Sequence, residues 1–85
     1  MSTEELTNKA KELVIKLRTA EALIRGGKLE DGIKLFKEAT KEARDAKLFD
    51  NYIAIIRRIR RLIIETRAMQ LRRTAQETKT GDRKA

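Results

Sequence analysis

The chain of 85 residues contains no Pro and only four Gly. An all-β sandwich or barrel needs turn residues about every 8 to 12 positions, so this composition excludes such folds. Leu and Ile must supply the core, because the aromatic residues are only Phe36, Phe49 and Tyr52. A chain this short forms one domain at most and lies near the lower size limit for a self-sufficient hydrophobic core. We therefore expect a single all-α domain.

The first predicted helix begins near residue 3. Ser2 and Glu5 fit a capping box, in which the hydroxyl and the carboxylate accept hydrogen bonds from backbone N–H groups at the helix start. Gly26 and Gly27 end the helix, because Gly adopts the left-handed conformation at a helix C-terminus without steric cost. Between these ends, apolar residues recur at spacings of four and three, as in a helix that packs along a partner: Leu6, Ala10, Leu13, Leu17, Ala20 and Ile24.

A second helix is expected from about residue 29. Glu30 and Asp31 fall in its first turn, where carboxylates interact favourably with the positive end of the helix dipole. Gly32 and Ala39 flank its apolar face, and small residues at these positions favour a close approach of the first two helices as a hairpin. The residues of that face are Leu29, Ile33, Phe36, Thr40 and Ala43.

The third helix is expected to be the longest. It follows a turn within residues 45–51 and ends near residue 75 or 78, with one apolar face formed by Tyr52, Ile55, Ile56, Ile59, Leu62, Ile63 and Thr66. The predicted fold is an antiparallel three-helix bundle of residues 1–78 with a short polar C-terminal tail, basic and flexible, at residues 79–85. Because the second helix is shorter, the end of the third should extend past the turn at Gly26 and Gly27 and lie near Arg25 and Lys28.

The sequence contains neither Cys nor His. Their absence removes disulfides, zinc ribbons, thiol nucleophiles and the commonest general base. We therefore expect a protein without catalytic residues, cofactor, metal site or small-molecule substrate, and not an enzyme. Its uncharged runs are far shorter than the roughly 18 to 20 residues that cross a bilayer, and its start is acidic, unlike a signal peptide. A cytoplasmic location with no membrane partner is expected.

The second predicted helix carries an acidic cluster that resembles a metal site. Glu38, Glu42 and Asp45 could hold Mg²⁺ on the outer face of the second helix. Lys34, Lys37 and Lys41 stand among them at helical spacing, so surface ion pairs within that helix explain the cluster better.

Part of the chain resembles known helical hairpins. A small residue in the first helix, a turn Gly, and an aromatic residue and an Ala in the second resemble the tetratricopeptide-type repeat, carried here by Ala20, Leu23, residues 27–31, Ile33, Phe36 and Ala39. Residues 9–14, with the sequence KAKELV, are similar to the start of the MIT-domain hairpin. The resemblance covers about residues 9–45 and implies a helical hairpin that binds other proteins.

Positive charge is concentrated in the second half of the chain. Residues 1–45 carry ten basic and nine acidic side chains, whereas residues 46–85 carry eleven and four, so the net charge of +8 divides into +1 and +7. Residues 57–73 alone hold seven Arg and a single acid, Glu65. This density of guanidinium groups indicates a polyanionic partner.

The arrangement of these Arg residues favours a phosphate backbone. Each guanidinium can bind two phosphate oxygens and displace counterions, and no aromatic side chain lies among them to stack on bases. The sequence therefore predicts binding of structured RNA, DNA or a ribonucleoprotein, through Arg25, Lys28, Arg57, Arg60, Arg61, Arg67, Arg72 and Arg73. The 40% of charged residues, together with the many Ile, is also typical of the solvated surface of a heat-adapted, thermostable protein.

Three apolar residues of the third helix lie off its main apolar face. These are Ile53, Ile64 and Leu71, at spacings of 11 and 7. Either they widen the core towards the first helix, or they form a groove for a helical protein partner or a homodimer. The alternative function is accordingly a protein-interaction module of tetratricopeptide or MIT type, or a self-associating helical scaffold.

Overall fold

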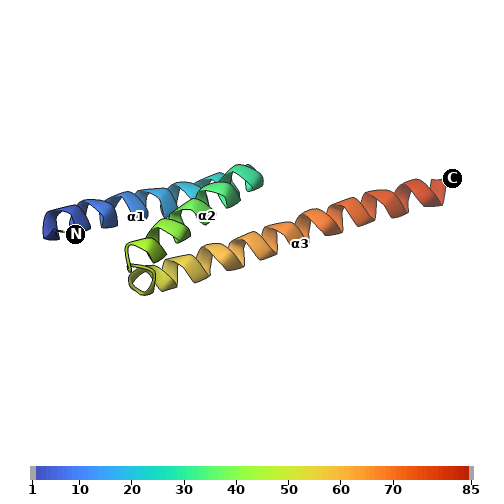
Figure 1. Cartoon of the computed structure of the whole chain (residues 1–85). Helices are drawn as coiled ribbons and strands as arrows, with labels where there is room; N and C mark the ends of the chain where they lie inside the picture. The colour runs from blue at the N-terminus through green and yellow to red at the C-terminus, as the bar shows by residue number, and fades with distance from the viewer. Residues whose placement is uncertain (1, 85) are drawn as a thin grey trace.

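The computed structural model describes the backbone of residues 2–84 and the side chains of residues 2–74. It contains three α-helices, α1 (Thr3–Arg25), α2 (Leu29–Asp45) and α3 (Ile53–Lys84), with a short 3₁₀ turn, η1 (Asp50–Tyr52), before α3 (Figure 1). No strand occurs in the described part of the chain. The predicted all-α fold of three helices, with the third one longest, is therefore confirmed.

The ends of α1 follow the predicted signals. The Glu5 backbone N–H donates to Ser2 Oγ at 3.2 Å, and the Ser2 N–H donates to Glu5 Oε2 at 3.4 Å, which completes the capping box. At the other end, Gly27 has a φ of 91°, and the Lys28 N–H donates to the Leu23 carbonyl at 2.8 Å. This left-handed Gly turns the chain back into α2.

The exit from α2 uses the same hydrogen-bond pattern without a Gly. Lys47 has a φ of 61°, and the Leu48 N–H donates to the Ala43 carbonyl at 2.7 Å. Leu48 is buried directly after this turn, in a small cluster with Leu13 and Ala43. The turn lies within the predicted residues 45–51, and its hydrophobic contact holds a non-Gly residue in the left-handed region.

Gly32 allows α1 and α2 to pack closely. A Cβ atom at Gly32 would lie 2.5 Å from Cγ1 of Ile24 and 2.9 Å from the carbonyl oxygen of Ala20. Ala20 and Ala39 are completely buried nearby in the core. The predicted close approach of the first two helices is confirmed at Gly32, and Ala39 is buried in the core.

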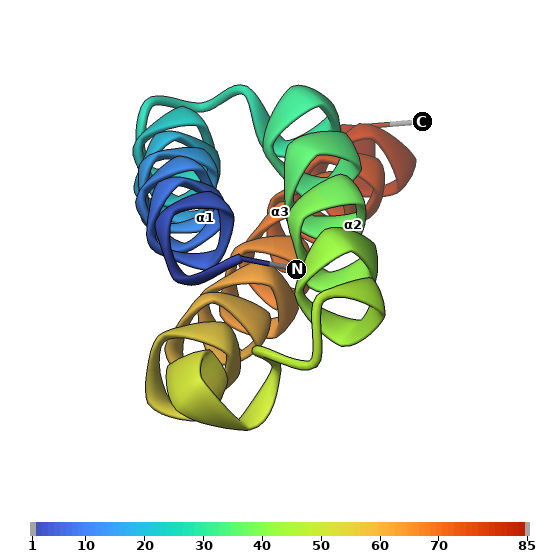
Figure 2. The ribbon, with the colours of Figure 1, turned by 60° about the vertical axis from the view of Figure 1, so that its left-hand side comes forward.

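One face of α3 packs against the hairpin. Ile56, Ile59 and Ile63 are buried in the same core as Leu17 and Phe36. Figure 2 shows α3 lying against both α1 and α2. The apolar faces predicted for the three helices are therefore the core faces. Leu6 departs from this pattern, with 37% of its surface exposed, because the first turns of α1 extend past the end of α2 (Figure 1).

The C-terminal part of α3 extends beyond the α1–α2 turn (Figure 1). The side chains of residues 67–74 are all exposed except the half-buried Ala68. The helix continues to Lys84, past the end predicted near residues 75–78. Gly81 alone does not end it, because one Gly costs a helix only about 1 kcal/mol relative to Ala. The side chains of residues 75–84 lie outside the described part, and the division into a domain and a flexible tail at 79–85 stays a prediction.

Replacing Gly32 by Ala should loosen the hairpin. The new methyl group must displace backbone as well as Ile24, so the free energy of unfolding should fall by about 1–2 kcal/mol, although Ala favours a helix by about 1 kcal/mol over Gly. Urea unfolding followed by circular dichroism measures the change. Lys34→Ala, at an exposed site of the same helix, is the control and should change stability by less than about 0.5 kcal/mol. A Gly32→Ala variant that is more stable than the original would contradict the close contact.

Candidate nucleic-acid interface

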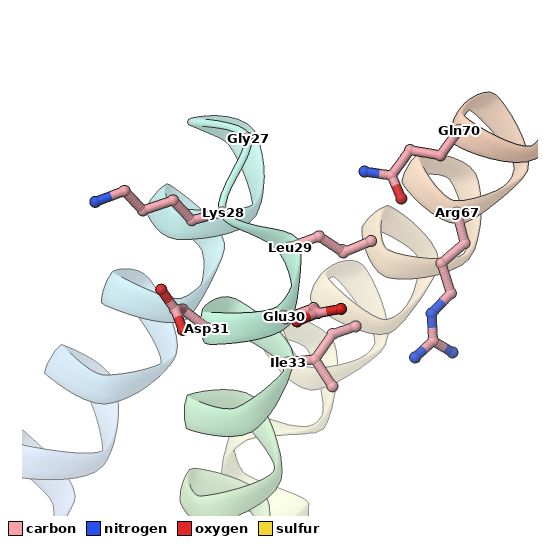
Figure 3. Close-up of a pocket in the computed structure, with 8 residues that line it drawn as sticks. All are labelled: Gly27, Lys28, Leu29, Glu30, Asp31, Ile33, Arg67 and Gln70. Carbon is pink, nitrogen blue, oxygen red and sulfur yellow. The ribbon is translucent and has the colours of Figure 1, made fainter. Parts of the chain in front are cut away.

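The α1–α2 turn and α3 enclose a cleft at one end of the bundle. Its volume is about 530 Å³. Arg67 and Gln70 reach it from α3, while the other lining residues belong to the turn and the first turns of α2 (Figure 3). Those residues are Gly27, Lys28, Leu29, Glu30, Asp31 and Ile33.

A second cleft adjoins the first and shares Gly27 and Gln70 with it. It measures about 420 Å³ and brings Arg25 of α1 together with Arg73 of α3. The extension of α3 therefore meets the turn as expected from the topology, with Lys28 in the cleft of Arg67 and Arg25 in the cleft of Arg73. We call these four residues the basic end.

Carboxylates moderate the charge of the first cleft. Glu30 and Asp31 line it beside Arg67, and they lie in the first turn of α2, where the helix dipole favours negative charge. Figure 3 shows the Lys28 ammonium pointing away from Arg67. The positive charge of this end is therefore presented outward, around the clefts, and is not focused on one point inside them.

The other predicted contacts lie along the outer surface of α3. Arg57 and Arg61, with Ala54 and Arg58, line a shallow depression of about 270 Å³. Arg60 and Arg72 are exposed and line none of the clefts above. The predicted nucleic-acid contacts thus lie on more than one side of α3, along its length as far as the basic end.

Arg58 differs from its neighbours because it holds α3 to α1. Its Nε donates to Glu21 Oε2 at 2.9 Å and its Nη2 donates to Glu21 Oε1 at 3.2 Å. Arg25 also reaches this carboxylate, at 3.6 Å. The Glu21 pair was not predicted, since a charge count does not show which guanidinium faces which carboxylate. The sequence offers one indication of this pair: Glu21 directly follows the core residue Ala20, so its side chain starts close to the face of α1 that packs on the other helices.

The acidic cluster of α2 forms ion pairs, but not with the predicted partners. Both carboxylate oxygens of Glu42 accept hydrogen bonds from Lys16 Nζ at 2.8 Å, and Lys9 Nζ lies 3.8 Å from Glu42. Glu38 pairs with Lys16 at 3.5 Å. The expectation of partners within α2, namely Lys34, Lys37 and Lys41, is wrong because this face of α2 lies against α1.

The Lys16 ammonium sets the ionisation of Glu42. Its hydrogen bond lowers the pKa of the Glu42 carboxyl below the usual value of 4.5, and the same hydrogen bond raises the pKa of Lys16. Glu42 is one-quarter exposed. In the described residues, no group of three or more acidic side chains is arranged to hold a metal ion.

The three residues of the predicted partner groove have different surroundings. Ile53 is half-buried, whereas Ile64 and Leu71 are 62% and 70% exposed. The latter two therefore do not widen the core towards α1. Met69, which was not predicted as a surface residue, is also exposed and lines the second cleft.

Comparisons with known proteins do not assign the chain. No protein-family model, curated protein or solved structure matches it. The resemblance to tetratricopeptide and MIT hairpins stays a prediction. Among the residues described, none of the helices combines the length and apolar character needed to cross a membrane.

Glu42→Gln should destabilise the protein in a pH-dependent manner. Because folding lowers the pKa of Glu42, its contribution is complete above the unfolded pKa and is lost as the pH falls through the folded pKa. Near neutral pH the variant should lose about 1 kcal/mol of unfolding free energy, and the difference should shrink towards about pH 3. Urea unfolding across this pH range measures it.

Glu38→Gln provides the matched control for this ion pair. Its carboxylate is more exposed and lies farther from Lys16, so we expect a change below about 0.5 kcal/mol at any pH. A Glu42→Gln effect of equal size at neutral and acidic pH would rule out the ionised pair as its cause.

Proposed function

We propose that the protein binds nucleic acid, either structured RNA or duplex DNA, through α3 and the basic end. One observation carries this proposal. Six Arg side chains of α3 are exposed, and within residues 2–74 no carboxylate oxygen lies within 4.0 Å of their guanidinium nitrogens. They are Arg57, Arg60, Arg61, Arg67, Arg72 and Arg73.

Exposed Arg in this number favours a phosphate backbone over isolated anions. A polyanion gains affinity from each counterion that it releases, so several guanidinium groups along one helix act together. The three aromatic side chains of the sequence, Phe36, Phe49 and Tyr52, are buried or half-buried. Base stacking therefore has no suitable partner, which favours a double-stranded or folded nucleic acid.

The basic end widens the contact surface beyond a single helix. Arg25 and Lys28 come from the α1–α2 turn, while Arg67 and Arg73 come from α3. Because these cations come from both the turn and α3, they can contact phosphates on two strands or on neighbouring turns of one strand. The proposed role is binding without catalysis, because the sequence offers neither His nor Cys for a reaction.

Binding should depend steeply on salt. If six phosphates are contacted, raising the salt concentration from about 50 to about 200 mM should weaken affinity about a thousandfold. Fluorescence anisotropy with a labelled RNA hairpin and a labelled DNA duplex measures this dependence. A flat salt dependence, or no binding to either probe at low salt, would refute the proposed function.

Arg67→Glu combined with Arg72→Glu should abolish binding. Both side chains are exposed, so circular dichroism should show unchanged helical content. The control is Lys11→Glu combined with Lys47→Glu, which makes the same change in net charge at exposed sites away from the basic end. We expect the control to retain most of the affinity, and an equal loss in both variants would show that only net charge matters.

A further inference from the structure

An apolar stripe runs along the outer side of α3. Ile64 and Leu71 lie two helical turns apart and are 62% and 70% exposed. Ala68, half-buried, lies between them. The spacings of four and three place the three residues on one face of the helix, in the pattern by which helices pair along a seam. We call Ile64, Ala68 and Leu71 the outer stripe.

The described part of the chain leaves the outer stripe uncovered. The core side of α3 consists of Ile56, Ile59 and Ile63, which pack against the α1–α2 hairpin. At 100° per residue, Ile64 is about 100° from Ile63 and 140° from Ile59 around the helix. The high exposure of Ile64 and Leu71 confirms that the stripe lies outside that core. Exposed apolar anchors two turns apart are typical of a site that receives another helix.

The charges beside the stripe define its partner. Positions that flank the seam of paired helices form ion pairs across the interface and determine which helices associate. Arg60 and Arg67 flank the outer stripe on one side, and Arg61 and Arg72 flank it with Glu65 on the other. Four cations against one anion require a partner with acidic flanking residues.

A second copy of this chain does not meet that requirement. If two outer stripes paired in antiparallel orientation, Arg60 and Arg67 would face the same residues of the other copy. In parallel orientation they would face the side that carries Glu65 and Arg72, so that two Arg residues would share one carboxylate and also meet a like charge. Like charges across such a seam are destabilising. Charge complementarity therefore argues against self-association through this face.

We propose that the outer stripe binds an acidic amphipathic helix of another protein. The apolar side chains of that helix would cover Ile64 and Leu71, and its carboxylates would pair with Arg60, Arg67 and Arg72. This proposal rests on the exposed apolar residues, so it stands or falls independently of nucleic-acid binding. Because both ligands would use the same three Arg, an acidic helix should also displace nucleic acid where that is bound.

A designed peptide tests the proposal directly. The probe is a labelled helix of about three heptads with Leu at the seam and Glu at the flanking positions. Fluorescence anisotropy with the full chain should show saturable binding. Two further peptides, one with Lys in place of Glu and one with Ser in place of Leu, should each bind at least about tenfold more weakly. Equal binding of either one would overturn the proposal.

Variants of the protein locate the site. Ile64→Ala combined with Leu71→Ala should weaken binding of the acidic peptide about tenfold or more, without loss of helical content or stability. Ile15→Ala removes an equally exposed apolar side chain from α1, with 65% of its surface accessible, and should have no effect. Unfolding of the double variant would show that the stripe is core and would overturn the proposal.

Two other outcomes would also overturn it. Sedimentation analysis could reveal a dimer that the Ile64→Ala and Leu71→Ala substitutions dissociate, and the occupant would then be a second copy. Alternatively, RNA or DNA could bind while the acidic peptide does not at the same protein concentration and salt. In that case the Arg residues would serve nucleic acid alone, and the proposed function would survive without the partner helix.

Discussion

The close contact between α1 and α2 at Gly32 determines how the rest of the chain is arranged. With no Cβ at Gly32, Ile24 and the Ala20 carbonyl can lie against the α2 backbone. Ile24 and Leu29 are then held in the same core as Ile59 and Ile63 of α3. A rigid hairpin gives the third helix a surface to pack on, which a chain of this size needs because its core is small.

The third helix carries two different kinds of surface as a result. Its Ile face and the Arg58–Glu21 pair hold it to the hairpin. Its other faces keep their Arg side chains in solvent. Where the helix passes the α1–α2 turn, Lys28 and Arg25 line clefts together with Arg67 and Arg73. The same topology that buries Ile59 therefore exposes the Arg residues and Ile64, and both proposals about binding depend on this division.

Much of this arrangement could be predicted from the sequence, because the signals are local. The capping box of Ser2 and Glu5, the left-handed Gly27 and the small Gly32 each act within a few residues or one helix pair. The partners of Glu42 and Arg58 could not be predicted, since they depend on which helix faces lie together. The exposure of Ile64 could not be predicted either, because helical periodicity gives the direction of a side chain but not whether another helix covers it.

The proposed site for the polyanion is the outer surface of α3 with the basic end, and not the remaining surfaces of α1 and α2. The Nε–Hε resonances of the Arg side chains, followed by NMR during titration with a DNA duplex or an RNA hairpin, test it most directly. We expect Arg67, Arg72 and Arg73 to shift first, while Arg58, held by Glu21, and Arg44, stacked over Phe49 at 4.8 Å, stay in place. Shifts centred on Arg44 or Arg18, with α3 unchanged, would contradict the account.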